Sequence, residues 1–143
     1  MALLARREHS RVELAQKLER AGGNPENFPA LFEYLEANNW LSDRRFAESY
    51  VADHRARDGA IKLAYALRQR GIADALITEV LSTLNSGHSD DSEVARAREI
   101  WRKKFKAQPS SPEERAKQMR FLQGRGFSVE TIRVAMKVED GDA

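Results

Sequence analysis

The segment Leu67-Arg68-Gln69-Arg70-Gly71-Ile72 decides the fold, because its Leu-x-x-x-Gly ending occurs three times in the chain. The other copies are LERAG at 18–22 and LQGRG at 122–126, so the endings begin 49 and then 55 residues apart. Glycine after an amphipathic stretch favours a helix C-terminus, where a left-handed residue lets late amides bond the last free carbonyls. The sequence therefore predicts an internal repeat in which one helix of each copy closes on glycine.

Helix-start signals surround these endings. Ser10 followed by Glu13 predicts a capping box, and Asn24, Ser42-Asp43, Ser111-Pro112 and Ser128 predict further helix starts. No segment alternates between apolar and polar residues as a strand does. We therefore predict an all-α protein with a three-helix repeat at 1–40, a second at 41–86, a polar linker at 87–91, a third repeat at 92–138 and an acidic tail at 139–143.

Expected helix faces follow from the apolar spacing. Phe28, Leu31, Phe32 and Leu35 predict one buried face, and the helix that begins at Ser42 is expected to end near residues 58–59.

Composition excludes several classes of protein. Of 143 residues, 41% are hydrophobic and 32% are charged, with a mean hydropathy of -0.64, so the chain can build a core, and no stretch is apolar enough to span a membrane. There is no cysteine, which excludes disulfides and thiolate metal sites. The charged start of the chain does not resemble a secretory signal, so we expect a cytoplasmic protein.

Charge is distributed unevenly along the chain. Residues 95–137 carry twelve basic and four acidic side chains, a local excess of +8, whereas the whole chain carries only +2. A solvated helix face and a contact surface for nucleic acid or an acidic partner both fit such a run.

Candidate catalytic and metal-binding residues are few. His9, His54 and His88 lack the close spacing of zinc ligands, so no metal site is expected. The glycine pairs do not form a phosphate loop, because no Lys-Ser/Thr pair follows them. Trp40 and Trp101 could stack on bases, but core packing is the favoured interpretation. These observations indicate a protein that is not an enzyme.

Several motifs in order resemble the RecX regulators of the RecA recombinase. The matching pieces are Leu4-Ala5-Arg6-Arg7-Glu8-His9-Ser10, Leu41-Ser42-Asp43-Arg44-Arg45-Phe46-Ala47, Leu67-Arg68-Gln69-Arg70-Gly71-Ile72, Arg102-Lys103-Lys104-Phe105, and Arg120-Phe121-Leu122 with Arg125-Gly126-Phe127. They span nearly the whole chain.

The resemblance implies an elongated, curved array of three tandem three-helix repeats. It implies binding to RecA and to its filament on single-stranded DNA, with inhibition of filament growth, strand exchange and coprotease activity in recombination, DNA repair and the SOS response. It implies no cofactor and no catalytic centre. We expect a monomer, because no coiled-coil heptad is present; whether single-stranded DNA is itself contacted is left open.

Partner-binding residues are expected among the basic side chains on the concave side of the array. The candidates are Arg102, Lys103, Lys104, Lys106, Arg120 and Arg125 in the third repeat, with Arg44, Arg45, Arg68 and Arg70 in the second. For Arg45 a structural ion pair is an open alternative. For the whole chain, the alternatives are a free-standing helical nucleic-acid-binding protein that acts without RecA, and a scaffold indifferent to DNA.

Overall fold

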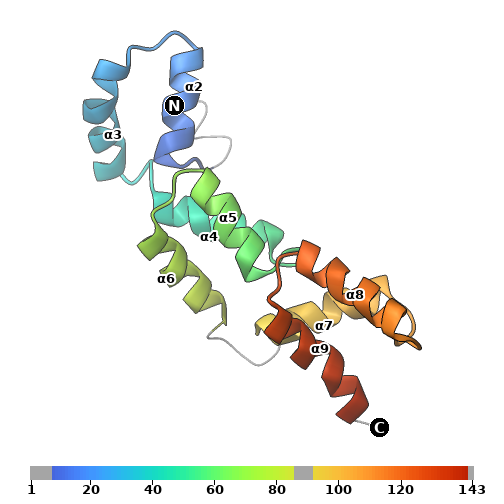
Figure 1. The fold of residues 1–143 in the computed structure, drawn as a ribbon. Helices are drawn as coiled ribbons and strands as arrows, with labels where there is room; N and C mark the ends of the chain where they lie inside the picture. Colours follow the sequence, from blue (N-terminus) through green and yellow to red (C-terminus); the bar gives the residue numbers. More distant parts are fainter. Residues whose placement is uncertain (1–7, 86–91, 142–143) are drawn as a thin grey trace. The chain divides into compact units, whose positions relative to one another are not determined.

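The computed structural model describes residues 8–85 and 92–141, and all regular structure in these ranges is helical. The elements are α2 (Arg11–Arg20), the 3-10 turn η1 (Pro25–Asn27), α3 (Phe28–Ala37), α4 (Asp43–His54), α5 (Ala60–Gln69), α6 (Asp74–Asn85), α7 (Glu93–Lys104), α8 (Pro112–Gly124) and α9 (Val129–Gly141) (Figure 1). The all-α prediction is confirmed. The predicted linker at 87–91, with His88, lies outside the described residues, as do residues 1–7 of the predicted first repeat.

The chain divides into two compact units. The first unit comprises Met1–Ala52 and Ala66–Val80, and the second comprises Asp53–Tyr65 and Leu81–Ala143. Helices α4, α5 and α6 therefore contribute residues to both units.

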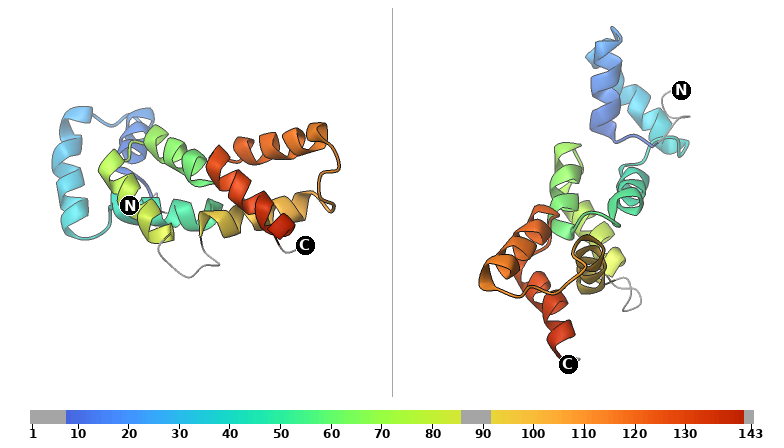
Figure 2. Two further views of the ribbon diagram at one scale, coloured as in Figure 1. Left: turned by 60° about the horizontal axis from the view of Figure 1, so that its bottom comes forward. Right: turned by 90° about the vertical axis from the view of Figure 1, so that its right-hand side faces the viewer.

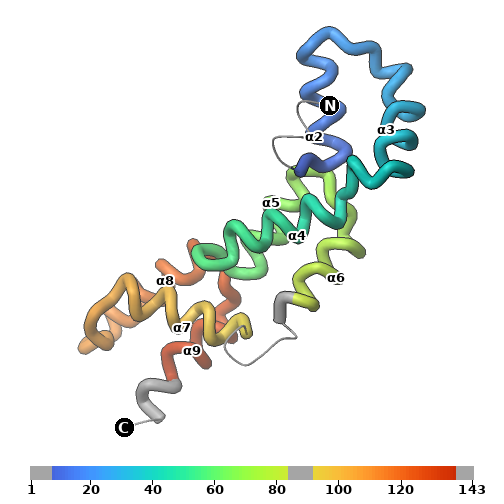
Figure 3. The backbone as a smooth tube through the Cα atoms, turned by 180° about the vertical axis from the view of Figure 1, so that it is seen from behind, coloured from blue at the N-terminus to red at the C-terminus, as the bar shows by residue number. Residues whose placement is uncertain are grey.

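In the first unit, α2 and α3 form a hairpin joined through η1 (Figure 3). The predicted capping box is confirmed, because the Ser10 side chain accepts a bond from the Glu13 amide and the Glu13 side chain accepts one from the Ser10 amide. A cluster of buried side chains fills the hairpin: Leu14, Phe28, Phe32, Leu35 and Leu41. Burial of these apolar groups stabilises two helices that are too short to be stable alone.

Two expectations about this hairpin are wrong. Leu31 is 38% exposed and Trp40 is 47% exposed, so neither belongs to the core. Trp40 instead packs edge-on against the exposed Tyr34, with ring centroids 5.8 Å apart. The three-and-four spacing predicts a stripe, but the width of the stripe that is covered depends on the neighbouring helix.

The glycine turn after α5 lies against the start of α2 in the first unit. Gly71 has a φ of 83°, as predicted for a helix end, and the Ile72 amide donates to the Leu67 carbonyl over 3.1 Å. A Cβ atom on Gly71 would lie 2.2 Å from Val12 Cγ2. The Ser10 hydroxyl donates to the Arg70 carbonyl over 2.7 Å, so the capping residue of α2 also holds this turn.

In the second unit, α9 packs against both α7 and α8, which also contact each other (Figure 2). The core of this helical trio consists of Ala97, Trp101, Leu122, Phe127, Ile132, Ala135 and Met136. The predicted start of α8 is confirmed, because the Ser111 side chain accepts a bond from the Glu114 amide. The Ser110 backbone N–H and hydroxyl both donate to the Glu114 carboxylate, and these bonds lower the pKa of Glu114.

The glycine turn after α8 lies against the start of α5, also within the second unit. Gly126 has a φ of 98°, and its carbonyl accepts a bond from the Ile61 amide over 3.0 Å. The Gly59 amide donates to the Arg125 carbonyl over 2.6 Å. The backbone of this turn is thus hydrogen-bonded directly to the backbone at the start of α5.

The loop between α4 and α5 is held by α7 within the second unit. Arg96 is only 6% exposed and donates to the Asp58 carbonyl over 3.1 Å, while its guanidinium pairs with Glu93. The Glu93 carboxylate also accepts a bond from the Ala60 amide over 2.7 Å. These contacts explain why α4 ends at His54 and not near the predicted residues 58–59, since the loop backbone is hydrogen-bonded to α7 and to the Gly126 turn.

Candidate nucleic-acid interface

The third-repeat candidates lie at the end of α7 and at the end of α8, in the second unit. Arg102, Lys103 and Lys104 occupy the last turn of α7, where cations stabilise the negative end of the helix dipole. All three are exposed, as are Lys106 and Arg120, and Arg125 is half-buried.

Phe121 of α8 brings two of these cations together. The Lys104 ammonium lies 5.6 Å from the centroid of the Phe121 ring, and the Arg125 guanidinium lies 5.4 Å from it. Phe105 contacts the same ring edge-on, with centroids 5.5 Å apart. We call Lys104, Phe105, Phe121 and Arg125 the Phe121 surface.

The cations of the Phe121 surface are not ion-paired within the described part of the chain. Among the side chains that the structure describes, no carboxylate forms an ion pair with Lys104 or Arg125, nor with the neighbouring Lys106 or Arg120. An aromatic face orients a cation without neutralising it. The surface can therefore attract phosphate groups or carboxylates of a partner.

The remaining α7 candidates have partners of their own. Lys103 pairs with Glu99 one turn earlier, over 3.2 Å, and both side chains are more than two-thirds exposed. An exposed pair of this kind is worth less than about 1 kcal/mol, so a stronger anion can displace it. Arg102 also has an interaction within the chain.

The second-repeat arginines are all ion-paired in the first unit. Arg44 lies 2.8 Å from Glu79, Arg45 lies 3.0 Å from Glu8, Arg68 lies 2.9 Å from Asp74 and Arg70 lies 3.9 Å from Glu13. The alternative of a structural ion pair for Arg45 is thus confirmed. Arg70 additionally covers the Tyr50 ring at 4.7 Å from the centroid.

Two aromatic members of the Phe121 surface were not among the predicted site residues. Phe105 and Phe121 each follow a basic residue directly in the sequence, at Lys104-Phe105 and Arg120-Phe121, and this adjacency is the signal that could have identified them. Their convergence depends on the packing of α7 against α8.

Trp101 is part of the core, as predicted. It is 3% exposed, and its indole N–H donates to the Gln118 side chain over 2.6 Å, so its ring is not available for stacking on bases.

Other sites are missing from the part of the chain that the structure describes. No group of three histidine, cysteine, aspartate or glutamate side chains there could hold a metal ion. His9 is buried, with its Nε2 atom 3.0 Å from the Lys17 ammonium. No helix among the described residues has both the length and the apolar character needed to cross a membrane.

Comparison with known proteins gives a consistent result. The family model described as RecX, second three-helix domain, matches residues 42–81, and the one described as RecX, third three-helix domain, matches residues 91–136. The chain is 42% identical to the regulatory protein RecX of Herminiimonas arsenicoxydans, over 96% of this chain and 87% of that protein. It is 38% identical to the regulatory protein RecX of Ralstonia pickettii, over 99% of this chain and 89% of that protein.

A solved structure shares the fold. The crystal structure of RecX from Lactobacillus salivarius superimposes with a TM-score of 0.83 at 20% identity, covering 97% of this chain and 90% of that one. The protein is thus an all-α array of three-helix repeats.

Proposed function

Because the chain belongs to the RecX family of regulatory proteins, we propose that it binds the filament of the RecA recombinase on single-stranded DNA and limits its growth. As a consequence it modulates, and mainly inhibits, strand exchange and coprotease activity in recombination, DNA repair and the SOS response. The protein acts as a monomeric cytoplasmic regulator, with three-helix repeats at 1–40, 41–86 and 92–138. The relatives are named regulatory proteins, not enzymes.

The observation that carries the proposal is the Phe121 surface. Lys104 and Arg125 are held on an aromatic ring at 5.6 Å and 5.4 Å without a carboxylate partner among the described side chains. A nucleoprotein filament offers both DNA phosphates and acidic protein side chains, and both attract such cations. Stacked helical repeats also create extended binding surfaces, which suit a partner built of repeated subunits.

The decisive experiment is a titration of the single-stranded-DNA-dependent ATPase of the cognate RecA. Inhibition is expected well below one copy of this protein per recombinase, because a filament regulator acts on many subunits at once. Absence of inhibition at excess, with the protein shown to be folded, would contradict the proposal. Duplex binding of a specific sequence without RecA would then favour the free-standing nucleic-acid binder.

The surface itself is tested by the double variant Lys104→Ala with Arg125→Ala. Binding to the filament should weaken and its salt dependence should flatten, by about 0.7 in the log–log slope for each DNA phosphate that the variant no longer binds. The matched control is Arg20→Ala with Arg57→Ala, which removes the same charge from exposed positions that are not among the candidate residues. Equal effects of the two double variants would show that net charge, not the Phe121 surface, governs binding.

A further inference from the structure

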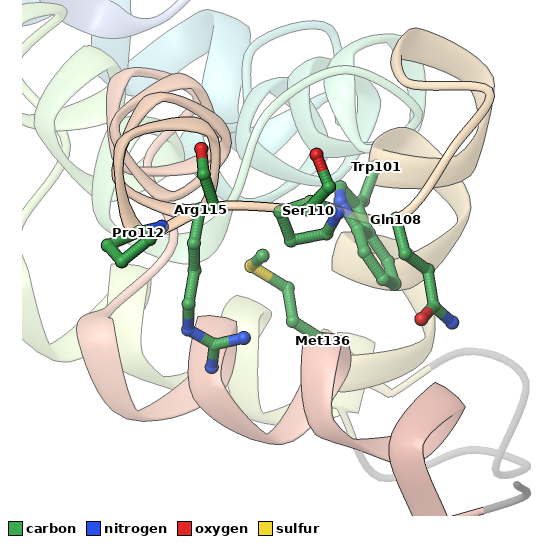
Figure 4. A pocket seen from close by; sticks show the side chains of 8 residues that line it. Trp101, Gln108, Ser110, Pro112, Arg115 and Met136 are labelled. Atoms are coloured by element: carbon green, nitrogen blue, oxygen red, sulfur yellow. The ribbon is translucent and has the colours of Figure 1, made fainter.

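A groove lies between α8 and α9 in the second unit. Two hollows share Arg115: the first, of about 390 Å³, is lined mainly by residues 108–112 before and at the start of α8, and the second, of about 510 Å³, lies between α8 and α9. In the first hollow, Met136 extends from α9 between Arg115 of α8 and Trp101 of α7 (Figure 4). The second hollow is lined by Arg115, Met119, Glu130, Arg133, Val134 and Lys137. We call this the α8–α9 groove, and each hollow has the size of an ordinary ligand pocket, about 300–1,000 Å³.

The lining of the groove combines apolar side chains with unneutralised cations. Val134 is 45% exposed, and Met119 is half-buried beside it. Arg115, Arg133 and Lys137 form no ion pair with any described side chain, and Glu130 is the single acidic residue that lines the second hollow. Methionine side chains adapt to differently shaped apolar partners.

The α8–α9 groove is separate from the Phe121 surface. On α8, the buried stripe contains Gln118 and Leu122. At 100° per residue, Arg115 and Met119 lie on one flank of this stripe, and Phe121 lies on the other flank. The third repeat therefore has two basic surfaces of different chemistry.

We propose that the α8–α9 groove binds an acidic peptide segment of a partner protein, with carboxylates on Arg115, Arg133 and Lys137 and apolar side chains on Met119 and Val134. Charge complementarity favours an acidic occupant. The apolar lining favours a peptide over single-stranded nucleic acid, whose binding sites use exposed aromatic rings for base stacking. The aromatic ring of this groove, Trp101, is 3% exposed and committed to Gln118.

Methyl-labelled methionine provides a direct reporter. The chain has three methionines, of which Met119 and Met136 line the groove. The probe is a fluorescein-labelled twelve-residue peptide of glutamate and aspartate with leucine or phenylalanine at every third or fourth position. Its addition to the full chain should shift the Met119 and Met136 methyl signals, which Met119→Leu and Met136→Leu variants assign.

Two control peptides separate charge from apolar contact. One replaces the acids by their amides, and the other replaces the apolar residues by serine. Both should bind at least tenfold more weakly than the probe, because the proposal requires both kinds of contact. Undiminished binding of either control would overturn the corresponding half of the proposal.

Matched protein variants locate the binding. Arg133→Gln with Lys137→Gln, both at exposed positions, and Arg115→Gln should each weaken the probe at least tenfold. Arg20→Gln with Arg57→Gln, at exposed positions outside both basic surfaces, should leave it unchanged. The exposed pair keeps the test valid if Arg115→Gln fails to fold. Probe affinity that is unchanged in the exposed pair, or methionine shifts produced equally by an oligothymidylate that displaces the probe, would overturn the proposal. Neither result would affect the ATPase experiment on the filament.

Discussion

The turn at Gly71 in the first unit and the turn at Gly126 in the second unit arise from the same sequence ending but meet different neighbours. Both have a positive φ, at 83° and 98°, and both lie against the start of an earlier helix. At Gly71 that neighbour is the Val12 side chain, and the linking bond comes from the Ser10 hydroxyl. At Gly126 the neighbour is the Lys62 backbone as well as its Cβ, and the linking bonds come from two backbone amides.

The two turns should therefore differ in how well they tolerate a side chain at the glycine position, although they share one sequence motif. A side chain can shift its rotamer or be shortened, whereas a backbone cannot retreat without losing its hydrogen bonds. The turn at Gly22 extends the comparison, because it has a φ of 94° and nothing within 4 Å of the position of a Cβ atom.

Gly126→Ala should have the largest effect on stability. The new Cβ atom would lie 2.6 Å from the Lys62 amide nitrogen, so strain of about 1–2 kcal/mol at the positive φ adds to overpacking and to weakened bonds at Gly59 and Ile61. We expect a loss of about 4 kcal/mol in the free energy of unfolding, measured by urea denaturation with circular dichroism. A loss under about 1 kcal/mol would show that the start of α5 shifts easily to make room for the new Cβ atom.

Gly71→Ala should cost less, about 2–4 kcal/mol, because the obstructing atoms belong to the Val12 side chain. The same denaturation measurement applies. The clash can be relieved by a second substitution: adding Val12→Ala should restore part of the lost stability in a double-mutant cycle. Strict additivity of the two changes would refute the steric clash with Val12 as the cause.

Gly22→Ala should have the smallest effect, about 1–2 kcal/mol, because only the backbone conformation opposes the new side chain. It is the control for the two larger changes. Equal losses at all three glycines would mean that the positive φ, and not the neighbouring helix, sets the cost.

Much of the fold was predictable from local sequence. The capping box at Ser10 and Glu13, the start of α8 at Ser111 and the glycine ends at Gly71 and Gly126 all depend on residues within one helical turn. The misjudged positions depend on contacts with distant residues. Leu31 and Trp40 are exposed because none of the described helices of their unit covers them, and α4 ends early because Arg96, 38 residues beyond Asp58, binds its loop.

The sequence predicts the basic residues of the candidate site, but it does not show which of them lie together on one surface. The sequence alone does not distinguish Arg44, which pairs with Glu79 thirty-five residues away, from Arg125, which lies on an aromatic ring. It also does not indicate that Arg115 and Arg133 line one groove.

By itself, the sequence determined the helical class, the capped helix starts, the repeated glycine turn and the excess of positive charge at 95–137, because capping, periodicity and charge are properties of neighbouring residues. Only the tertiary structure decided which cations are neutralised, which aromatic rings hold the others and which helix start receives each glycine turn. Those outcomes depend on distances between residues far apart in the chain, which helix packing sets and which no local pattern contains.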